Sequence, residues 1–300
     1  MTIEEDIKKL AKEKNAIILA HNYQPGNIQD IADVSGDSLE LSRIAAKNDA
    51  DIIVFCGVHF MAESASILSP QKTVLLPDEH AGCPMADMVE EEDLIELKAQ
   101  HPDAKVVAYI NSSAAVKAHC DVICTSSNAV KIVQRIDAQK IIFVPDRNLG
   151  SYVQKFTDKE IILWEGFCPT HERFTVDDLQ VIKSKHPDAL VMVHPECNPL
   201  VVDAADKVFS TGEMVSFVKD TNEKKIIVGT ESGMIHKLRS VNSGIEYIEA
   251  SDDFICPNMK KITPEKILIS LKENKIDIKV NEDIAQKANK ALKAMLDLSY

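Results

Sequence analysis

Three cysteines in this chain are each followed at once by proline, and they lie at nearly equal intervals along the sequence. They are Cys83, Cys168 and Cys256, separated by 85 and 88 residues. Cysteine thiolates bind zinc and iron–sulfur clusters, and Cys-Pro is a common ending of iron–sulfur ligand loops. The spacing therefore predicts three copies of one unit that each deliver a thiolate to a shared metal or cluster site, with one coordination position left open.

The type of metal follows from how far apart these thiols are in the sequence. Catalytic zinc usually draws on ligands that are clustered in sequence, which disfavours zinc bound by three sulfurs and a water. A [4Fe–4S] cluster held by Cys83, Cys168 and Cys256 fits better, and its fourth iron could act as a Lewis acid on substrate. No two cysteines have the Cys-x-x-Cys spacing of zinc ribbons. Cys197, beside Glu196, is the next candidate ligand.

Other residues repeat with the same period, which predicts an internal triplication. An apolar run in each unit is followed by an aspartate ten or eleven residues later and by a hydroxyl five residues after that. The phrase His-Pro-Asp-Ala also occurs twice, at residues 101–104 and 186–189. The repeated aspartates and hydroxyls are Asp33 and Ser38, Asp121 and Ser126, and Asp206 and Thr211.

Short apolar, β-branched runs alternate with helix-compatible segments in each unit. Strands of this kind, without internal polar alternation, are typical of parallel sheets buried on both faces. We therefore expect an α/β protein with three homologous three-layer αβα sandwich domains. If a pseudo-threefold axis relates them, their loops and cysteines meet in a central cleft.

The period also places the boundaries of these units. We expect the first unit at residues 1–82, the second at 83–167 and the third at 168–255. Residues 256–300 would supply the last cysteine and closing helices. The expected amphipathic helix at 281–300 would pack back on the first unit.

Composition and charge exclude several classes of function. The chain has 45% hydrophobic and 27% charged residues, as expected for a globular protein. Its net charge of −13 argues against a nucleic-acid partner. The acidic N-terminal segment does not resemble a signal peptide, and no apolar run is long enough to cross a bilayer. These features predict a cytoplasmic protein with no membrane partner.

Polar residues follow the first strand of each expected unit. In parallel sheets this position faces the ligand crevice. The residues are His21, Asn22, Tyr109, Asn111, His194 and Glu196.

Motifs along the whole chain resemble those of the quinolinate synthase family. The motifs are Ala20-His21-Asn22-Tyr23-Gln24, Asp30-Ile31-Ala32-Asp33, Phe60-Met61-Ala62-Glu63, Cys83-Pro84-Met85-Ala86, Tyr109-Ile110-Asn111-Ser112, Pro145-Asp146-Arg147-Asn148-Leu149, His194-Pro195-Glu196-Cys197 and Gly229-Thr230-Glu231-Ser232-Gly233-Met234. The resemblance implies a pseudo-threefold fold and one [4Fe–4S] cluster on three cysteines. It also implies a transferase of de novo NAD biosynthesis that joins iminoaspartate to dihydroxyacetone phosphate, giving quinolinate, phosphate and two waters. An aspartate oxidase or dehydrogenase would supply the iminoaspartate.

The chemistry and the resemblance together assign roles to individual residues. Glu196 is the first candidate for general acid/base during ring closure, with Tyr23 and Tyr109 as gates or proton donors and His21 and His194 as further proton-transfer groups. The resemblance implies a set of substrate contacts: His21, Ser38, Tyr109, Ile110, Asn111, Ser126, His194, Pro195, Glu196 and Thr211.

Simpler interpretations exist for several of these residues. A serine at a helix start is usually only an N-cap, and the recurring aspartates could serve only to fix a turn. The remaining histidines are expected to be surface or local structural residues, and His171 is the least certain of them. They include His59, His80, His119, His171 and His236.

Two other functions remain as alternatives at this stage. An aconitase-like hydro-lyase also uses a three-cysteine cluster with an open iron, but it would act on a single hydroxy acid. A non-catalytic iron–sulfur sensor would not need histidine, glutamate and tyrosine around the same cleft.

Overall fold

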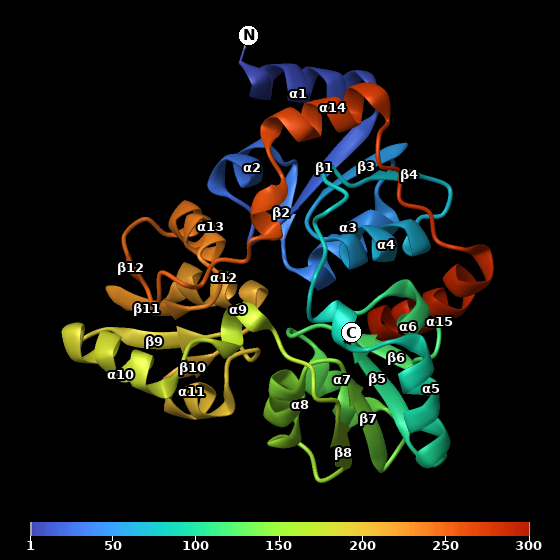
Figure 1. Ribbon diagram of the computed structural model, residues 1–300. Helices are drawn as coiled ribbons and strands as arrows, with labels where there is room; N and C mark the ends of the chain where they lie inside the picture. Colours follow the sequence, from blue (N-terminus) through green and yellow to red (C-terminus); the bar gives the residue numbers. More distant parts are fainter. Residues whose placement is uncertain (1, 300) are drawn as a thin grey trace.

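The computed structural model of the protein describes residues 2–299, which contain three parallel β-sheets of four strands each. The three sheets have the same strand order (Figure 1). The first is β2 (Val34–Gly36), β1 (Ala16–His21), β3 (Ile52–Cys56) and β4 (Thr73–Leu75). The second is β6 (Val122–Cys124), β5 (Lys105–Tyr109), β7 (Lys140–Val144) and β8 (Glu160–Leu163). The third is β10 (Lys207–Val208), β9 (Leu190–Val193), β11 (Lys225–Gly229) and β12 (Glu246–Glu249).

Helices connect these strands in the same pattern in every unit. The first unit contains α1 (Ile3–Glu13), α2 (Gly26–Ile31), α3 (Ser38–Lys47) and α4 (His59–Leu68). The second contains η1 (Ala86–Met88), α5 (Glu91–Gln100), α6 (Ala114–Lys117), α7 (Ala129–Arg135) and α8 (Arg147–Gln154). The third contains α9 (Pro169–Glu172), α10 (Val176–Lys185), α11 (Pro199–Ala204), α12 (Thr211–Asp220) and α13 (Gly233–Val241), and the chain ends with η2 (Met259–Lys261), α14 (Pro264–Glu273) and α15 (Glu282–Leu298).

Both faces of the sheets are buried, as the uniformly apolar strands predict. In the first sheet, Ile18 and Val54 pack in one cluster with Ile7 of α1 and residues of α14. The neighbouring strand residues Leu19 and Ile53 pack in the cluster that includes α3 and α4. Successive strand residues point to opposite faces, so the first unit is a three-layer sandwich. The expected α/β class with three αβα domains is confirmed.

The repeated His-Pro-Asp-Ala phrase has the same conformation in both places. Helix α5 is capped by His101 with φ −131° and ψ 67°, and α10 is capped by His186 with φ −132° and ψ 65°. In each case the N–H of the following alanine, Ala104 or Ala189, donates to the carbonyl of that histidine. The sequence repeat is therefore also a repeat of backbone structure.

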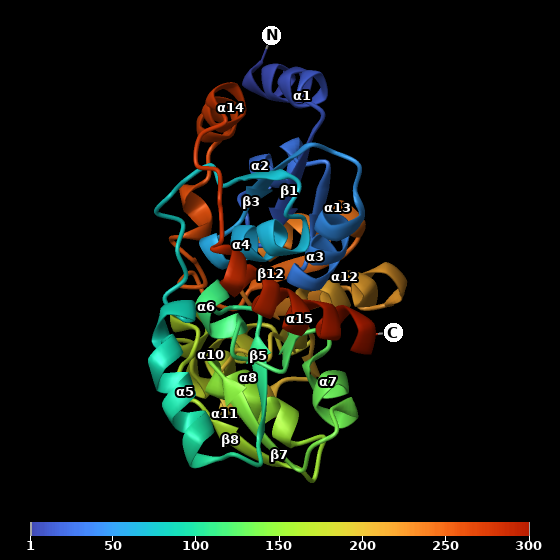
Figure 2. The same cartoon turned by 90° about the vertical axis from the view of Figure 1, so that its right-hand side faces the viewer.

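The C-terminal helices lie against different units. Helix α14 lies beside α1 on the outer side of the first unit, whereas α15 lies between the first and second units (Figure 2). The side chain of Asn289 donates to the carbonyl of Ile67, at 2.9 Å, and Lys131 of α7 donates to the carbonyl of Ser299, at 2.7 Å. Residue 300, at the end of the expected helix, lies outside the described residues. None of the described helices is both long and apolar enough to cross a membrane.

The three recurring aspartates each close the same turn. The strand N–H donates to the aspartate carboxylate at 2.8 Å in every unit, and the aspartate N–H donates back to the carbonyl of that strand residue. The pairs are Ile18–Asp33, Val106–Asp121 and Val191–Asp206. The aspartates thus have a structural role, and they precede the edge strands β2, β6 and β10.

We expect Asp33→Ala to lower the free energy of unfolding by about 1 kcal/mol, because one amide of β1 loses its acceptor in a part-exposed turn. Urea unfolding of the metal-free protein measures this loss. Asp158→Ala, at an exposed loop position, is the control. An equal effect of both substitutions would contradict the assigned role of the Asp33 carboxylate.

Candidate active site

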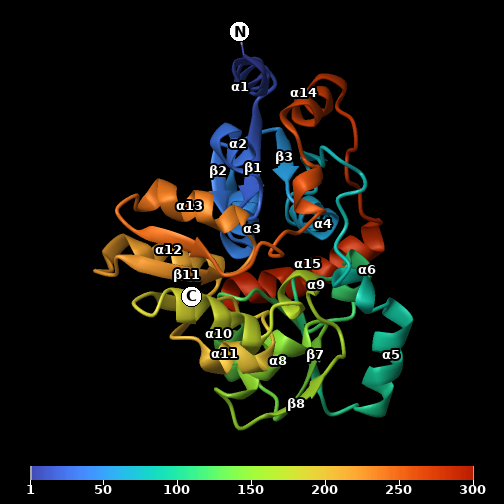
Figure 3. The ribbon, with the colours of Figure 1, turned by 60° about the vertical axis from the view of Figure 1, so that its left-hand side comes forward.

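The three Cys-Pro cysteines line one cavity at the meeting point of the units. Its walls also carry His21, Tyr23, Asn111 and Glu196 from the ends of strands or the loops that follow them, and Ser38 from the start of α3. All seven cysteines are free thiols. The central position of α9, which begins directly after Cys168, is visible in Figure 3. The predicted convergence of three widely spaced cysteines is therefore present in the structure.

A backbone N–H a few residues later acts to lower the pKa of each of these thiols, against the larger effect of burial. The N–H belongs to Ala86 for Cys83, to His171 for Cys168 and to Met259 for Cys256. A short helical turn follows each cysteine. Helix α9 begins at the residue after Cys168, and η1 and η2 begin three residues after Cys83 and Cys256. Amide donors of this kind stabilise sulfur when it carries negative charge.

Burial keeps the thiols protonated in the metal-free protein. It raises the pKa of Cys83 to about 12, and it also raises the pKa values of Cys168 and Cys256. Metal binding must therefore displace protons from these thiols. The donor set of three sulfurs with backbone N–H partners fits an iron–sulfur cluster, because such amide contacts to sulfur accompany cluster ligation.

Two histidines at the ends of equivalent strands have the same orientation. The N–H of Tyr23 donates to Nδ1 of His21, at 3.2 Å, and the N–H of Glu196 donates to Nδ1 of His194, at 3.3 Å. Because Nδ1 accepts in both rings, Nε2 carries the proton in the neutral form. Nε2 of His194 lies 3.1 Å from Oγ of Ser126, so the two rings are positioned to donate hydrogen bonds through Nε2.

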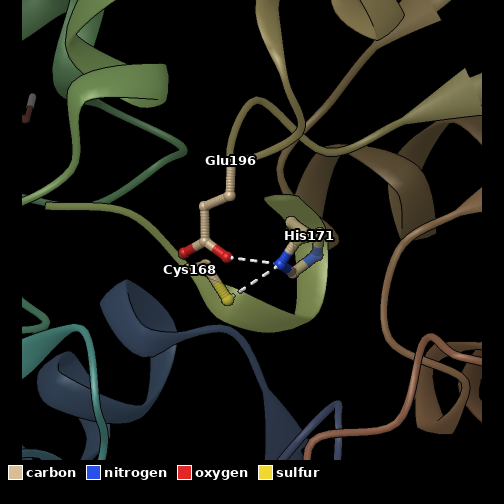
Figure 4. A group of neighbouring side chains, drawn as sticks. All are labelled: Cys168, His171 and Glu196. Atoms are coloured by element: carbon tan, nitrogen blue, oxygen red, sulfur yellow. Dashed lines mark hydrogen bonds and ion pairs between the residues drawn. The ribbon is translucent and has the colours of Figure 1, made fainter. Parts of the chain in front are cut away.

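The carboxylate of Glu196 is held between Tyr109 and His171. The hydroxyl of Tyr109 donates to Oε1 at 2.6 Å, and Nδ1 of His171 lies 2.9 Å from Oε2. Figure 4 shows that Nδ1 of His171 also faces Sγ of Cys168, at 3.1 Å. Cys168, His171 and Glu196 form a compact group of potential metal-ligating atoms. The base predicted from sequence therefore lies directly beside a predicted ligand.

A chain of hydrogen bonds continues from His171 to a second tyrosine. Nε2 of His171 lies 2.9 Å from Oγ1 of Thr230, and that oxygen lies 2.6 Å from the hydroxyl of Tyr23. When Nδ1–H donates to Glu196, Nε2 accepts from Thr230, and Thr230 accepts from Tyr23. One uncharged path thus joins Tyr23 to Glu196.

Burial sets the protonation states of these groups. It lowers the pKa of His21 to about 4 and of His194 to about 3, although Glu196 partly opposes both shifts. Burial alone would raise the pKa of Glu196, but the nearby His171 and His194 and the hydrogen bonds from His171 and Tyr109 hold it below its ordinary value. Burial raises the pKa values of Tyr23 and Tyr109. At neutral pH the site therefore holds an ionised Glu196 beside the neutral rings of His21 and His194.

The three repeated hydroxyls lie at or near helix starts but are not the capping groups of α3 and α12. Asp37 caps α3 and Ser210 caps α12, which leaves the hydroxyls of Ser38 and Thr211 outside the capping role. Ser126 precedes α7 and pairs with His194. The interpretation of these hydroxyls as simple N-caps is therefore wrong for the first and third units.

The remaining predicted contacts lie at the same edge of the sheets. Asn111 lines the cavity, and its buried Oδ1 has no hydrogen-bond partner among the described residues. Such an orphaned acceptor is normally satisfied by a ligand or water. Ile110 and Pro195 are buried in the loops that follow β5 and β9. Cys197 packs in the core of the third unit rather than on the cavity wall, so the reserve ligand is not needed.

His171 is not the surface residue that was one of the two roles expected for it, surface or local structural. Its side chain is only 1% exposed and lies in the cavity wall. The signal was its place three residues after Cys168, in the ligand loop. Thr230 and Glu231 also lie in the site, within a motif that carried the family resemblance without an assigned role. Four other histidines pair with acidic side chains away from the cavity: His59, His80, His119 and His236.

Comparison with known proteins gives one consistent result. The family model described as quinolinate synthetase A protein matches residues 5–297. The quinolinate synthase of Geobacter sp. (strain M21) is 55% identical over 295 residues, which is 98% of this chain and 97% of that protein. That of Caldicellulosiruptor saccharolyticus is 52% identical, covering 99% and 98% of the two chains. That of Dehalococcoides mccartyi (strain CBDB1) is 51% identical, covering 98% and 97%.

We expect the metal-free protein to lose stability as the pH falls from 7 to 5. The pKa of His194 is about 3 in the folded chain, below the ordinary value of 6.5 that holds after unfolding. Between these values the unfolded chain takes up a proton that the folded chain refuses, which costs on the order of 2 kcal/mol at pH 5. Urea unfolding of His194→Gln should show a weaker pH dependence. His80→Gln, at an exposed position, is the control and should behave like the wild type.

Proposed function

This chain belongs to the quinolinate synthetase A protein family, and on this premise we propose that it condenses iminoaspartate with dihydroxyacetone phosphate to give quinolinate, phosphate and two waters. The observation that carries the proposal is the joint cavity in which thiols from three units meet an ionised, hydrogen-bonded Glu196. This product is a precursor in NAD biosynthesis, and both substrates are small anions.

A [4Fe–4S] cluster is the cofactor that we propose for this cavity, held by Cys83, Cys168 and Cys256. The support is the donor set of three buried thiols with backbone N–H partners and no fourth cysteine in the cavity wall among the described residues. When bound, such a cluster supplies one iron without a protein ligand, which can bind a substrate hydroxyl and make it a better leaving group.

Hydroxyls and imidazoles would hold the anionic groups of the substrates. The hydroxyls of Ser38 and Thr211 lie in the first turns of α3 and α12, where the positive end of the helix dipole favours a carboxylate or phosphate. His21 and His194 direct Nε2–H groups from neighbouring strand ends. The orphaned Oδ1 of Asn111 supplies an acceptor for a substrate hydroxyl or imine N–H.

Glu196 is the residue that we assign to proton transfer in the ring closure and dehydration steps. Its low pKa means that it begins as the base, and a bound substrate that removes the hydrogen bonds from Tyr109 and His171 would make it more basic. The hydrogen bonds from Tyr23 through Thr230 to Nε2 of His171 keep Nδ1–H of that ring directed at Glu196. Tyr109 and Tyr23 stay protonated and act as donors.

The alternatives account for fewer of the observations. A single metal ion on Cys168, His171 and Glu196 would use the most compact ligand group but would leave Cys83 and Cys256 in the cavity wall without a role. An aconitase-like hydro-lyase or an iron–sulfur sensor has no counterpart among the relatives that were compared.

Anaerobic purification and reconstitution, followed by an assay with both substrates, tests the proposal. We expect a brown protein that contains about four irons per chain and forms quinolinate only when iminoaspartate and dihydroxyacetone phosphate are both present. Cys83→Ala should lose both the cluster spectrum and the activity. A Cys83→Ala protein that retains iron and activity would overturn the proposed cofactor site.

We expect Glu196→Gln to lower kcat by about 10²- to 10⁴-fold, the usual range for a general base. Glutamine keeps the size of the side chain and can still accept from Tyr109, so the iron content should be unchanged. Steady-state kinetics with an iron determination measures both quantities. Glu249→Gln, at an exposed strand end, is the control. Wild-type kcat in Glu196→Gln would remove Glu196 from the mechanism.

A further inference from the structure

A second fully buried carboxylate, Glu231, lies in the cavity wall and has no part in the mechanism above. Its side chain is 0% exposed. Its Oε2 accepts from the N–H of Gly233 at 2.8 Å, and its Oε1 accepts from the N–H of Cys256 at 3.0 Å. Through the bond to the N–H of Cys256, Glu231 in one loop holds the backbone of a predicted cluster ligand in another loop.

Lys260 neutralises this carboxylate and extends the contact to the first unit. Its Nζ lies 2.7 Å from Oε1 of Glu231, and it also donates to the carbonyl of Tyr23 at 2.7 Å. The lysine side chain is about one-quarter exposed, whereas the glutamate side chain is buried. A buried carboxylate without such a partner would carry a large desolvation cost. The pair therefore joins three segments: the loop after β11, the Cys256 loop and the loop after β1.

The surrounding backbone is packed so closely that small shifts are not tolerated. A side chain at Gly233 would place its Cβ 2.6 Å from the carbonyl oxygen of Tyr23. The N–H of Ser232 donates to the carbonyl of Phe254 at 2.8 Å. Ile255, which directly precedes the cysteine, is 48% exposed, whereas Phe254 and Met259 on either side are buried. Between these two apolar anchors, the N–H of Cys256 itself is held by the carboxylate of Glu231.

We propose that the Glu231–Lys260 ion pair is a positioning device that holds the Cys256 loop against Tyr23, so that the third thiol and the tyrosine of the hydrogen-bonded path are placed together. The part that concerns the cluster rests on the proposed function. Glu231 acts through the Cys256 backbone and Lys260 acts through the Tyr23 backbone, so both are positioning residues.

The reactivity of Cys256 in the metal-free full-length chain tests this proposal without any cluster. Alkylation by iodoacetamide, followed by mass spectrometry, gives a separate rate for each cysteine. We expect the rate at Cys256 to rise about tenfold in both Glu231→Gln and Lys260→Met, which corresponds to about 1.4 kcal/mol of lost loop stabilisation. The rates at Cys83 and Cys168 should stay within about twofold of wild type, because their loops lack this contact.

The two substitutions separate positioning from simple electrostatics. The negative charge of Glu231 raises the pKa of the Cys256 thiol and the positive charge of Lys260 lowers it, although burial makes the largest contribution. Electrostatics alone therefore predicts faster alkylation in Glu231→Gln and slower alkylation in Lys260→Met. Loss of positioning predicts faster alkylation in both. Slower or unchanged alkylation in Lys260→Met would overturn the proposal.

A reconstituted protein provides the second readout. We expect Lys260→Met to bind the same amount of iron as wild type but to lose it to a chelator about tenfold faster. Glu160→Gln, which removes the exposed pair between Lys140 and Glu160, is the matched control and should match wild type in both assays. Thermal unfolding shows whether each variant is folded, and if Glu231→Gln is not, Lys260→Met alone decides.

The two proposals can fail separately. A wild-type chain that binds no iron removes the proposed cofactor but leaves the alkylation result valid for the ion pair. A wild-type chain that binds iron and forms quinolinate, with Cys256 equally protected in Lys260→Met, keeps the proposed function and removes the positioning role.

Discussion

The site depends on one constraint, which is that all four strands of each sheet are parallel. Parallel strands place all their carboxyl ends at one edge of the sheet, so the chemically active loops of a unit gather there. The three units then direct these edges to the same cavity. The aspartates that close the equivalent turns preserve this geometry, because each fixes the start of an edge strand against the central one. The thiols, imidazoles and carboxylate could not meet without that common direction.

Much of this arrangement could be predicted from the sequence, because it depends on periodic features. The interval between Cys83, Cys168 and Cys256 indicates three units and one meeting point, and the apolar strands indicate parallel sheets. The edge strands β2 and β10 are too short for a pattern to reveal them. His171 and Lys260 were missed because their roles arise from contacts with residues far away in sequence, Glu196 in one case and Tyr23 and Glu231 in the other. Such contacts leave no local pattern.

The electrostatics of the cavity balance charge against burial. The ionised carboxylate of Glu196 is retained in an environment that keeps His21 and His194 neutral and three thiols protonated. Its charge is stabilised by directed hydrogen bonds rather than by water. Binding of an anionic cluster or substrate would disturb this balance. We therefore expect ligand binding to be coupled to the uptake or release of protons by the site.

The wide separation of the three cysteines along the chain also limits when the site can form during synthesis. Units of a multidomain chain fold in order as they leave the ribosome, so the first two thiols are already in folded surroundings before Cys256 is made. No fragment that ends before Cys256 contains the complete ligand set. The proposed cluster would therefore have to be inserted into a nearly finished chain. A chain truncated before Cys256 would also lack α14 and α15, so it would lose core packing of the first two units together with the last thiol.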